Sequence, residues 1–244
     1  MQAPWGRVLR CQPLTAVAEH FFTDASLELR ERADEWNAVA ALAGIPPDHL
    51  LLLRQVHGRG VVVADASRTT GWTRPEADAV VSDDPASALV VRVADCAPIL
   101  LADRRQRVVA AVHAGWRSTM QRIVGAAVES MRGQFGSHPS DLLAAMGPSL
   151  GACCGEMGEE VVEAFRAAGH SEANIERWFE RAAGQRPHFD LWRANRDQLA
   201  EAGVPAVQTF SADLCTRTYA DRFHSYRAKG QHVGRMAAVI RPAR

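Results

Sequence analysis

Residues 108–124, VVAAVHAGWRSTMQRIV, decide how the surrounding chain folds. The apolar, β-branched run over 108–112 predicts a buried strand, and the small pair Ala114-Gly115 then turns the chain. We expect Ser118 or Thr119 to cap a helix after this turn. Apolar residues recur along that helix at three- and four-residue spacing, namely at Met120, Ile123, Val124, Ala127, Val128 and Met131. The segment is therefore predicted to be a strand, a loop and a helix.

Two side chains with useful chemistry flank the turn. His113 precedes it and Arg117 follows it. In sheets covered by helices, ligands bind in the crevice beyond the strand ends, and a helix N-terminus adds partial positive charge there. A metal-ligating imidazole beside an anion-binding guanidinium therefore indicates a binding site. The alternative interpretation is a core histidine next to a surface arginine.

The overall composition is charge-balanced. The 244 residues include 28 Lys and Arg and 28 Asp and Glu, which gives a formal net charge of zero. No basic tail or stripe indicates nucleic acid or an anionic membrane as a partner, so we expect a small-molecule substrate. No apolar run approaches the roughly 20 residues that span a bilayer, and residues 1–22 do not resemble a secretion signal. Five irregularly spaced cysteines fit a reducing compartment, so a cytoplasmic protein is expected.

Patterns elsewhere predict alternating strands and helices. Phe21 and Phe22 are expected in the core. Helices are predicted at 33–43, 159–168 and 191–202, and strands at 50–53, 61–64, 79–81, 89–93, 99–102, 142–146, 206–210 and 236–240. Neither an internal repeat nor a linker is evident. We therefore predict one compact α/β domain over residues 1–244.

Three potential metal ligands follow predicted strands that are far apart in the sequence. They are His57, Cys96 and His113. Two imidazoles and one thiolate form a catalytic zinc set, because three protein ligands leave the fourth tetrahedral position open. A closed structural site, with a fourth ligand from Cys153 or Cys154, is the alternative. Copper also suits these ligands, so their chemistry alone does not select the metal.

Ten short segments follow one another along the chain in a distinctive order. They are RQVHG (54–58), ADCAP (94–98), HAGWR (113–117), GPS (147–149), CC (153–154), DLW (190–192), NR (195–196), CT (215–216), SYR (225–227) and GRM (234–236). Together they resemble the YfiH family of laccase-domain proteins, which were later understood as purine nucleoside phosphorylases. The similarity covers about residues 50–240. Gly155 departs from the family pattern, since an aromatic residue is common there, and so does Ser118, where glycine is common.

This resemblance implies an α/β fold of the YfiH type, similar to the catalytic domains of cytotoxic necrotizing factors, with mixed sheets and flanking helices. It implies that His57, Cys96 and His113 bind zinc. The implied activity is phosphorolysis of adenosine, inosine and methylthioadenosine to the free base and a ribose 1-phosphate, with adenosine deamination as a side activity. The implied partners are a purine nucleoside and phosphate, and we expect a monomer.

Four further residues receive roles in this hypothesis. Arg117 can hold the phosphate through charge-assisted, bidentate hydrogen bonds. Arg227 is a second candidate for the anion, with a structural surface arginine as the alternative, and Gln55 and Arg227 are assigned to substrate binding. Asp95 is the candidate proton carrier for deamination, or alternatively orients a metal ligand.

Two other functions remain open. One is a copper-dependent polyphenol oxidase, although a single His/His/Cys set is far short of the histidines that a four-copper laccase requires. The other, also suggested by the resemblance, is an amidase in peptidoglycan precursor editing, with Cys96 as the nucleophile and His113 as the base instead of metal ligands. That reaction requires a thiolate free of metal.

Overall fold

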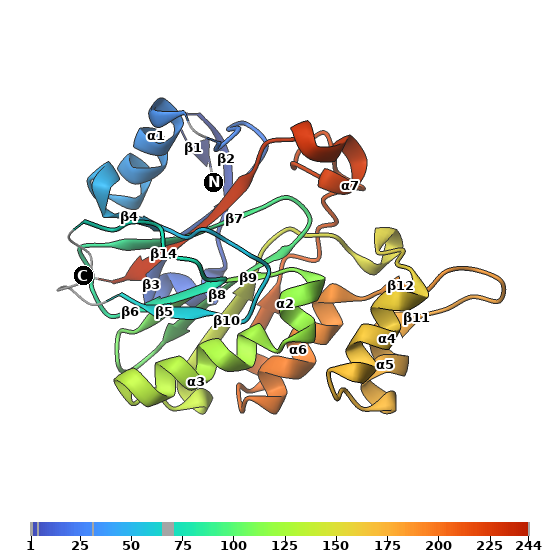
Figure 1. The fold of residues 1–244 in the computed structure, drawn as a ribbon. Helices are drawn as coiled ribbons and strands as arrows, with labels where there is room; N and C mark the ends of the chain where they lie inside the picture. Colours follow the sequence, from blue (N-terminus) through green and yellow to red (C-terminus); the bar gives the residue numbers. More distant parts are fainter. Residues whose placement is uncertain (1, 4, 31, 65–70, 244) are drawn as a thin grey trace.

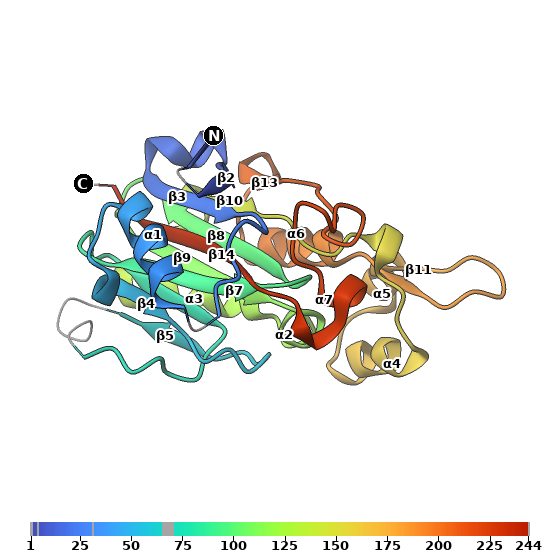
Figure 2. The same ribbon diagram turned by 90° about the horizontal axis from the view of Figure 1, so that it is seen from above.

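Two six-stranded sheets pack face to face, and helices cover their outer faces (Figures 1 and 2). This computed structural model describes residues 2–3, 5–30, 32–64 and 71–243. A buried apolar core fills the space between the sheets, and a second and a third core lie between each sheet and its helices. The predicted α/β fold with mixed sheets and flanking helices is confirmed.

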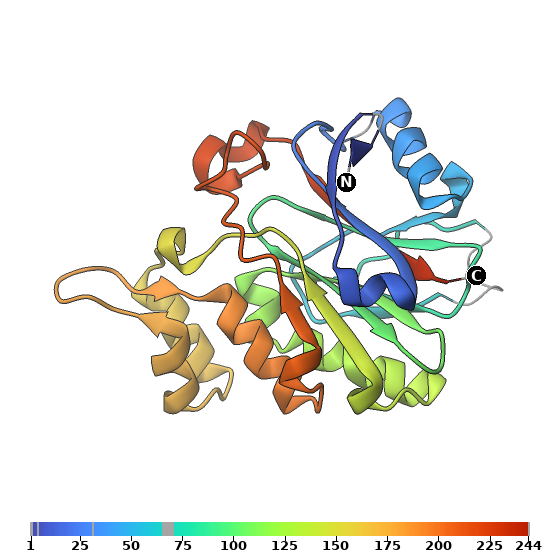
Figure 3. The same ribbon diagram turned by 180° about the vertical axis from the view of Figure 1, so that it is seen from behind.

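The first sheet contains both ends of the described chain. Strand β3 pairs antiparallel with β14, so the N-terminal and C-terminal segments lie side by side (Figure 3). Phe21 and Phe22 of β3 are buried, as predicted. Only β4 and β7 pair in parallel in this sheet. The strand order is β1 (Gln2–Ala3), β2 (Gly6–Leu9), β3 (Ala18–Thr23), β14 (Met236–Pro242), β7 (Ala88–Val93) and β4 (Leu50–Leu52).

The second sheet lies between the first sheet and the helices that cover its own outer face. Its central strands are therefore buried on both faces. In β8, Leu100 faces the core between the sheets, whereas Leu101 faces the helices. This double burial explains why the strand sequences are continuously apolar instead of alternating. The strand order is β13 (Thr209–Ser211), β10 (Leu142–Met146), β8 (Ala97–Asp103), β9 (Val109–Ala114), β6 (Ala79–Ser82) and β5 (Val61–Val63).

Helices cover the outer face of each sheet. Helix α1 (Ala33–Ala43) packs Trp36 and Val39 on the first sheet and ends at Gly44, whose φ of 68° favours glycine. Helices α3 and α6 pack on the second sheet. The other helices are α2 (Trp116–Met120), α3 (Ile123–Phe135), α4 (Glu159–Ala167), α5 (Glu172–Trp178), α6 (Leu191–Glu201) and α7 (Tyr226–Lys229). The remaining short elements are the two-stranded sheet β11 (Phe179–Glu180) with β12 (His188–Phe189), and 3-10 turns at Gln12–Ala16, Pro47–His49, Pro139–Asp141, Ala152–Cys154, Ala206–Gln208 and Gly230–His232.

The predicted cap of the helix after Gly115 is wrong. The helix begins at Trp116, and Gly115 itself occupies the N-cap position, so Ser118 and Thr119 are buried inside α2. The predicted single helix is also divided, because Arg122 adopts a left-handed conformation with a φ of 60°. The apolar periodicity continues across this break, which is why the spacing of the residues did not reveal it.

Most other predicted elements lie within a residue or two of those observed. The strand predicted at 206–210 is instead a 3-10 turn, with β13 starting at Thr209. Helices α5 and α7 and strands β1 to β3, β11 and β12 were not predicted. Within the described part of the chain, no helix combines the length and apolar character needed to cross a bilayer.

Candidate metal centre

Two of the three candidate ligands lie in links where the chain crosses between the sheets, and the third lies in a strand beside them. His57 lies in the link from β4 of the first sheet to β5 of the second, and Cys96 lies in the link from β7 to β8. His113 lies in strand β9 itself, paired with Pro98 of β8 and therefore close to Cys96. Because these sheets are mainly antiparallel, the site forms at the crossings and not at a parallel-sheet switch point.

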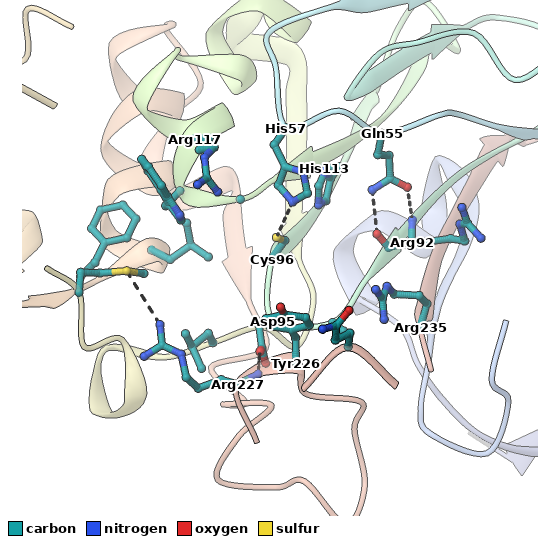
Figure 4. A pocket seen from close by; sticks show the side chains of 18 of the residues that line it. Gln55, His57, Arg92, Asp95, Cys96, His113, Arg117, Tyr226, Arg227 and Arg235 are labelled. Atoms are coloured by element: carbon teal, nitrogen blue, oxygen red, sulfur yellow. Dashed lines mark hydrogen bonds between the residues drawn. The ribbon is translucent and has the colours of Figure 1, made fainter. Parts of the chain in front are cut away.

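The side chains of His57, Cys96 and His113 converge on one point (Figure 4). Nε2 of His57 lies 3.8 Å from Sγ of Cys96. The two imidazole rings meet edge to face, with centroids 4.8 Å apart and an interplanar angle of 74°. One ligand atom from each residue lies within 4.8 Å of the other two. His57 is exposed and His113 buried, so the group lies at the base of a surface pocket.

Gly115 provides the space for this convergence. A Cβ atom at this position would lie 2.8 Å from Sγ of Cys96 and 3.1 Å from Cδ2 of His57. The backbone here is extended, with a φ of −79° that any residue can adopt. Glycine is therefore required for space and not for conformation.

Asp78 supports two of the candidate ligands and was not identified from the sequence. Its side chain is completely buried, and Oδ1 lies 2.8 Å from Nδ1 of His113. Its carboxylate also accepts hydrogen bonds from the backbone N–H groups of His57, at 2.9 Å, and Gly58, at 2.6 Å. Burial raises the pKa of Asp78, but the hydrogen bonds from His113 and from these amides outweigh it, so the pKa is lowered. In the sequence, the signal for this role is a lone aspartate directly before the apolar run that forms the buried strand β6.

The thiol of Cys96 and the imidazole of His113 favour each other's charged form. Burial raises the pKa of Cys96, but the charge and hydrogen bonds of His113 and His57 outweigh burial and lower it to about 6. Burial lowers the pKa of His113, but Cys96 and Asp78 raise it to about 9. Without metal, the pair is therefore a thiolate and an imidazolium at neutral pH.

Two residues of the crossing links have a strained backbone. His57 has a φ of 59° and Asp95 a φ of 87°, a region that costs non-glycine residues about 1–3 kcal/mol. The hydrogen bond from His57 to Asp78 holds the first link. The carbonyl of Asp95 accepts a 2.8 Å hydrogen bond from the N–H of Leu150, which holds the second. Such strain is typical of functional sites whose surroundings over-determine the backbone.

Asp95 lies on the pocket wall, but it is tied to the C-terminal part of the chain. Its Oδ1 accepts a 2.6 Å hydrogen bond from the hydroxyl of Thr216, and its Oδ2 accepts one of 2.6 Å from the backbone N–H of Arg227. The carboxylate that contacts a candidate ligand is Asp78. The orienting role considered for Asp95 is therefore filled by a different aspartate.

Gln55 connects the first crossing link to strand β7. Its amide oxygen accepts a hydrogen bond from the backbone N–H of Arg92, and its amide nitrogen donates to the carbonyl of the same residue, both at 2.8 Å. Gln55 lines the pocket with part of its side chain while the amide fixes the geometry of the backbone. Each end of the amide still has capacity for one more hydrogen bond.

The pocket has a volume of about 900 Å³ and a strongly cationic lining. Among the described lining residues, Asp95 is the single carboxylate, so the pocket favours an anionic ligand. Trp116 and Tyr226 supply aromatic surface. At Gly155 an added Cβ would collide with the carbonyl oxygen of Phe189, so an aromatic side chain does not fit there. The lining arginines are Arg30, Arg54, Arg92, Arg117, Arg227 and Arg235.

The two predicted anion-binding arginines both line the pocket, with Arg117 above and Arg227 below in the view of Figure 4, but they differ in their contacts. The guanidinium of Arg117 stacks on the ring of Trp116, with Cζ 4.2 Å from the ring centroid. Arg117 takes part in none of the ion pairs found among the described residues. Arg227 instead donates from Nη1 to the carbonyl of Glu156 at 2.8 Å. Arg117 is thus the more available of the two.

The cysteines considered as a fourth ligand lie elsewhere. Cys153 and Cys154 form a separate group with Cys215. Within the described residues, the candidate centre therefore has the three predicted ligands.

Comparisons with known proteins show the family and the fold to which this chain is similar. The family described as multi-copper polyphenol oxidoreductase laccase matches residues 27–243. A protein of Deinococcus radiodurans named purine nucleoside phosphorylase is 39% identical over 98% of this chain and 94% of its own. A protein of an unknown prokaryotic organism named adenosine deaminase is 38% identical over 81% of this chain and 76% of its own. The crystal structure of YlmD from Geobacillus stearothermophilus superimposes with a TM-score of 0.87, at 25% identity, over 97% of this chain and 96% of that one.

Proposed function

The chain belongs to the multi-copper polyphenol oxidoreductase laccase family, and from this premise we propose that it is a zinc-dependent purine nucleoside phosphorylase. The proposed substrates are adenosine, inosine and methylthioadenosine, with adenosine deamination as a side activity. In phosphorolysis, the bond from the purine to the ribose carbon breaks, and a phosphate oxygen bonds to that carbon. The observation that carries the proposal is the convergence of His57, Cys96 and His113 in an arginine-lined pocket.

The donor set fits a zinc ion. Because Nδ1 of His113 is bonded to Asp78, its Nε2 is available to a metal, an arrangement common among metal-binding histidines. The 3.8 Å between Nε2 of His57 and Sγ of Cys96 is near the roughly 3.5 Å expected for neighbouring nitrogen and sulfur ligands of tetrahedral zinc. When bound, zinc supplies Lewis acidity toward a water or a substrate oxygen. The same donors would also accept copper.

The surrounding side chains suit the other reactants. Arg117 can donate two hydrogen bonds to phosphate, and its stacking on Trp116 restricts the guanidinium before the anion binds. Trp116 and Tyr226 offer aromatic surface for a purine. Asp95 is our proposed proton carrier in the deamination, because each of its oxygens retains a lone pair beyond the hydrogen bonds described above.

The decisive experiment separates the two proposed reactions. Purified protein loaded with zinc is incubated with inosine, with and without phosphate, and hypoxanthine is measured by chromatography. We expect release of hypoxanthine only when phosphate is present. Adenosine incubated without phosphate should yield inosine slowly. If zinc is bound but hypoxanthine does not appear with phosphate, the proposal is wrong.

One observation favours a second candidate, the amidase. Asp78, His113 and Cys96 form a line in which a carboxylate orients an imidazole beside a thiolate, as in cysteine nucleophiles. A peptidoglycan-precursor amide would be its substrate. Activity that survives chelation but is abolished by thiol alkylation would support this candidate over the metal-dependent one. Loss of activity on chelation and its recovery with zinc would exclude it.

A copper-dependent phenol oxidase would require a different metal at the same site. It requires stoichiometric copper in the purified protein and phenol oxidation that is lost in His113→Ala. Elemental analysis together with that variant distinguishes it from the phosphorylase.

A further inference from the structure

A second group of three thiols lies apart from the residues that line the pocket. The Sγ atoms of Cys153, Cys154 and Cys215 all lie within 4.8 Å of one another, and those of Cys153 and Cys154 are 3.6 Å apart. The hydroxyl of Thr218 lies 3.6 Å from the first sulfur and 3.7 Å from the second. Cys153 is exposed whereas Cys215 is buried, so the group is open to solvent on one side.

The fold brings these thiols together through backbone hydrogen bonds. The 3-10 turn Ala152–Cys154 carries two of them. Ser149, just before this turn, forms a parallel bridge with Cys215 and accepts a 3.0 Å hydrogen bond from the N–H of the residue that follows Cys215. At Gly151, a Cβ atom would lie 3.3 Å from Cβ of Cys215 and 2.9 Å from the ring of Trp192. A side chain at position 151 would therefore crowd both Trp192 and the segment that carries Cys215.

We propose that Cys153, Cys154 and Cys215 bind a thiophilic metal ion, with Cu⁺ preferred over Zn²⁺. Thiolates select these two metals over harder cations. Structural zinc ordinarily takes four protein ligands, and here the fourth would be the hydroxyl of Thr218, a poor donor for it. Three sulfurs complete a trigonal Cu⁺ shell. Each thiol that coordinates the ion releases its proton to solvent.

A bound ion would join the turn at 152–154 to the segment at 215–218. The second crossing link of the pocket is held nearby, because Thr216 of the second segment and Leu150, two residues before the turn, hydrogen-bond to Asp95. The three thiols are brought together only in the folded chain, so the ion would bind the folded state and not the unfolded one. Binding of the metal should therefore raise the melting temperature. This inference does not depend on the proposed phosphorylase activity.

The test counts ions in a protein whose candidate metal centre has been removed. Full-length Cys96→Ser protein is reduced, titrated anaerobically with Cu⁺ or with Zn²⁺, desalted and analysed for metal. We expect one Cu⁺ per chain, tighter binding of Cu⁺ than of Zn²⁺, and a higher melting temperature. Adding Cys153→Ser or Cys215→Ser should abolish this binding, whereas the matched control Cys11→Ser should leave it intact.

Two results would overturn the proposal. One is that Cys96→Ser protein retains no Cu⁺ after desalting. The other is that the protein retains Cu⁺ equally with and without Cys153. Cys153 is exposed, so its replacement should be tolerated even if the Cys215→Ser variant fails to fold. If Zn²⁺ binds the group more tightly than Cu⁺, the assigned preference is wrong.

Discussion

Oδ1 of Asp78 lies 2.8 Å from Nδ1 of His113, and the two side chains are 0% and 4% exposed. A buried carboxylate in this position fixes both the orientation of the ring and the nitrogen that faces the other ligands. The aspartate also accepts hydrogen bonds from the backbone of the link that carries His57. One side chain therefore positions two of the three candidate ligands.

The first prediction concerns this aspartate. Asp78→Asn should weaken zinc binding by roughly 10- to 100-fold, the usual effect of removing a carboxylate behind a metal-bound histidine. Zinc affinity is measured by competition with a chelator, and near-ultraviolet circular dichroism confirms folding. The matched control is Asp95→Asn, whose carboxylate bonds to Thr216 and Arg227 instead. Equal loss of affinity in both variants would contradict the assigned roles.

The second prediction concerns the space left by Gly115. In Gly115→Ala the new methyl group meets Sγ of Cys96 at 2.8 Å, and such overpacking costs about 1–3 kcal/mol. If that strain falls on the metal-loaded geometry, zinc affinity falls roughly 5- to 160-fold. Gly125→Ala is the control, because no atom lies within 4 Å of its added Cβ and helix α3 gains from alanine. Unchanged zinc binding in Gly115→Ala would show that the ligands do not need this approach.

The third prediction is a pH dependence in metal-free protein. The pKa of Cys96 is lowered from 9.0 to about 6, so its thiolate fraction, and with it the rate of alkylation by iodoacetamide, should rise through pH 6 and level off above pH 7. Peptide mapping by mass spectrometry follows each cysteine separately. Cys153, whose pKa is raised to about 11, should still be gaining reactivity at pH 9.

Zinc provides the internal control for this titration. Coordination should protect Cys96 from alkylation across the whole pH range. In urea-unfolded protein, the reactivity of Cys96 should return to a midpoint near 9, because its neighbours His113 and His57 are then distant. A midpoint near 9 in the folded, metal-free protein would refute the thiolate–imidazolium pair.

The fourth prediction concerns Arg117 and phosphate. Losing charge-assisted hydrogen bonds worth about 1.5–3 kcal/mol should raise the KM for phosphate roughly 10- to 150-fold in Arg117→Ala, with little change in the KM for inosine. Steady-state kinetics with each substrate varied in turn measure both constants. Arg132→Ala, an exposed arginine of helix α3 outside the pocket, should behave as wild type. A KM for phosphate that stays constant would place the anion at another of the lining arginines.

Local sequence patterns predicted most of the strands and helices, but not which strands belong to which of the two sheets. Continuous apolar runs such as 99–102 indicated buried strands because both faces of β8 are covered. Strands β1 to β3 gave weaker patterns, and β3 joins this segment to the rest of the sheet by pairing with β14, more than 200 residues away. The break at Arg122 depends on one backbone conformation that many residue types can adopt.

The three candidate ligands could be proposed from the sequence, but their support could not. His57, Cys96 and His113 each occur beside a glycine, a turn or a strand end. Asp78 precedes an apolar strand like many structural aspartates, and its role emerges only when β6 is paired with β9, which places its carboxylate at Nδ1 of His113. The group formed by Cys153, Cys154 and Cys215 likewise requires the bridge between two distant segments.

The two links that carry His57 and Cys96 each run from one sheet to the other. A metal ion bound at the candidate metal centre would therefore connect the two sheets of the sandwich at this edge. If zinc binds there as proposed, its removal would abolish this connection, and we expect the two sheets to separate more readily at this edge. Limited proteolysis of the metal-free protein should then begin in these links. The metal available to the protein would therefore affect its lifetime as well as the proposed activity.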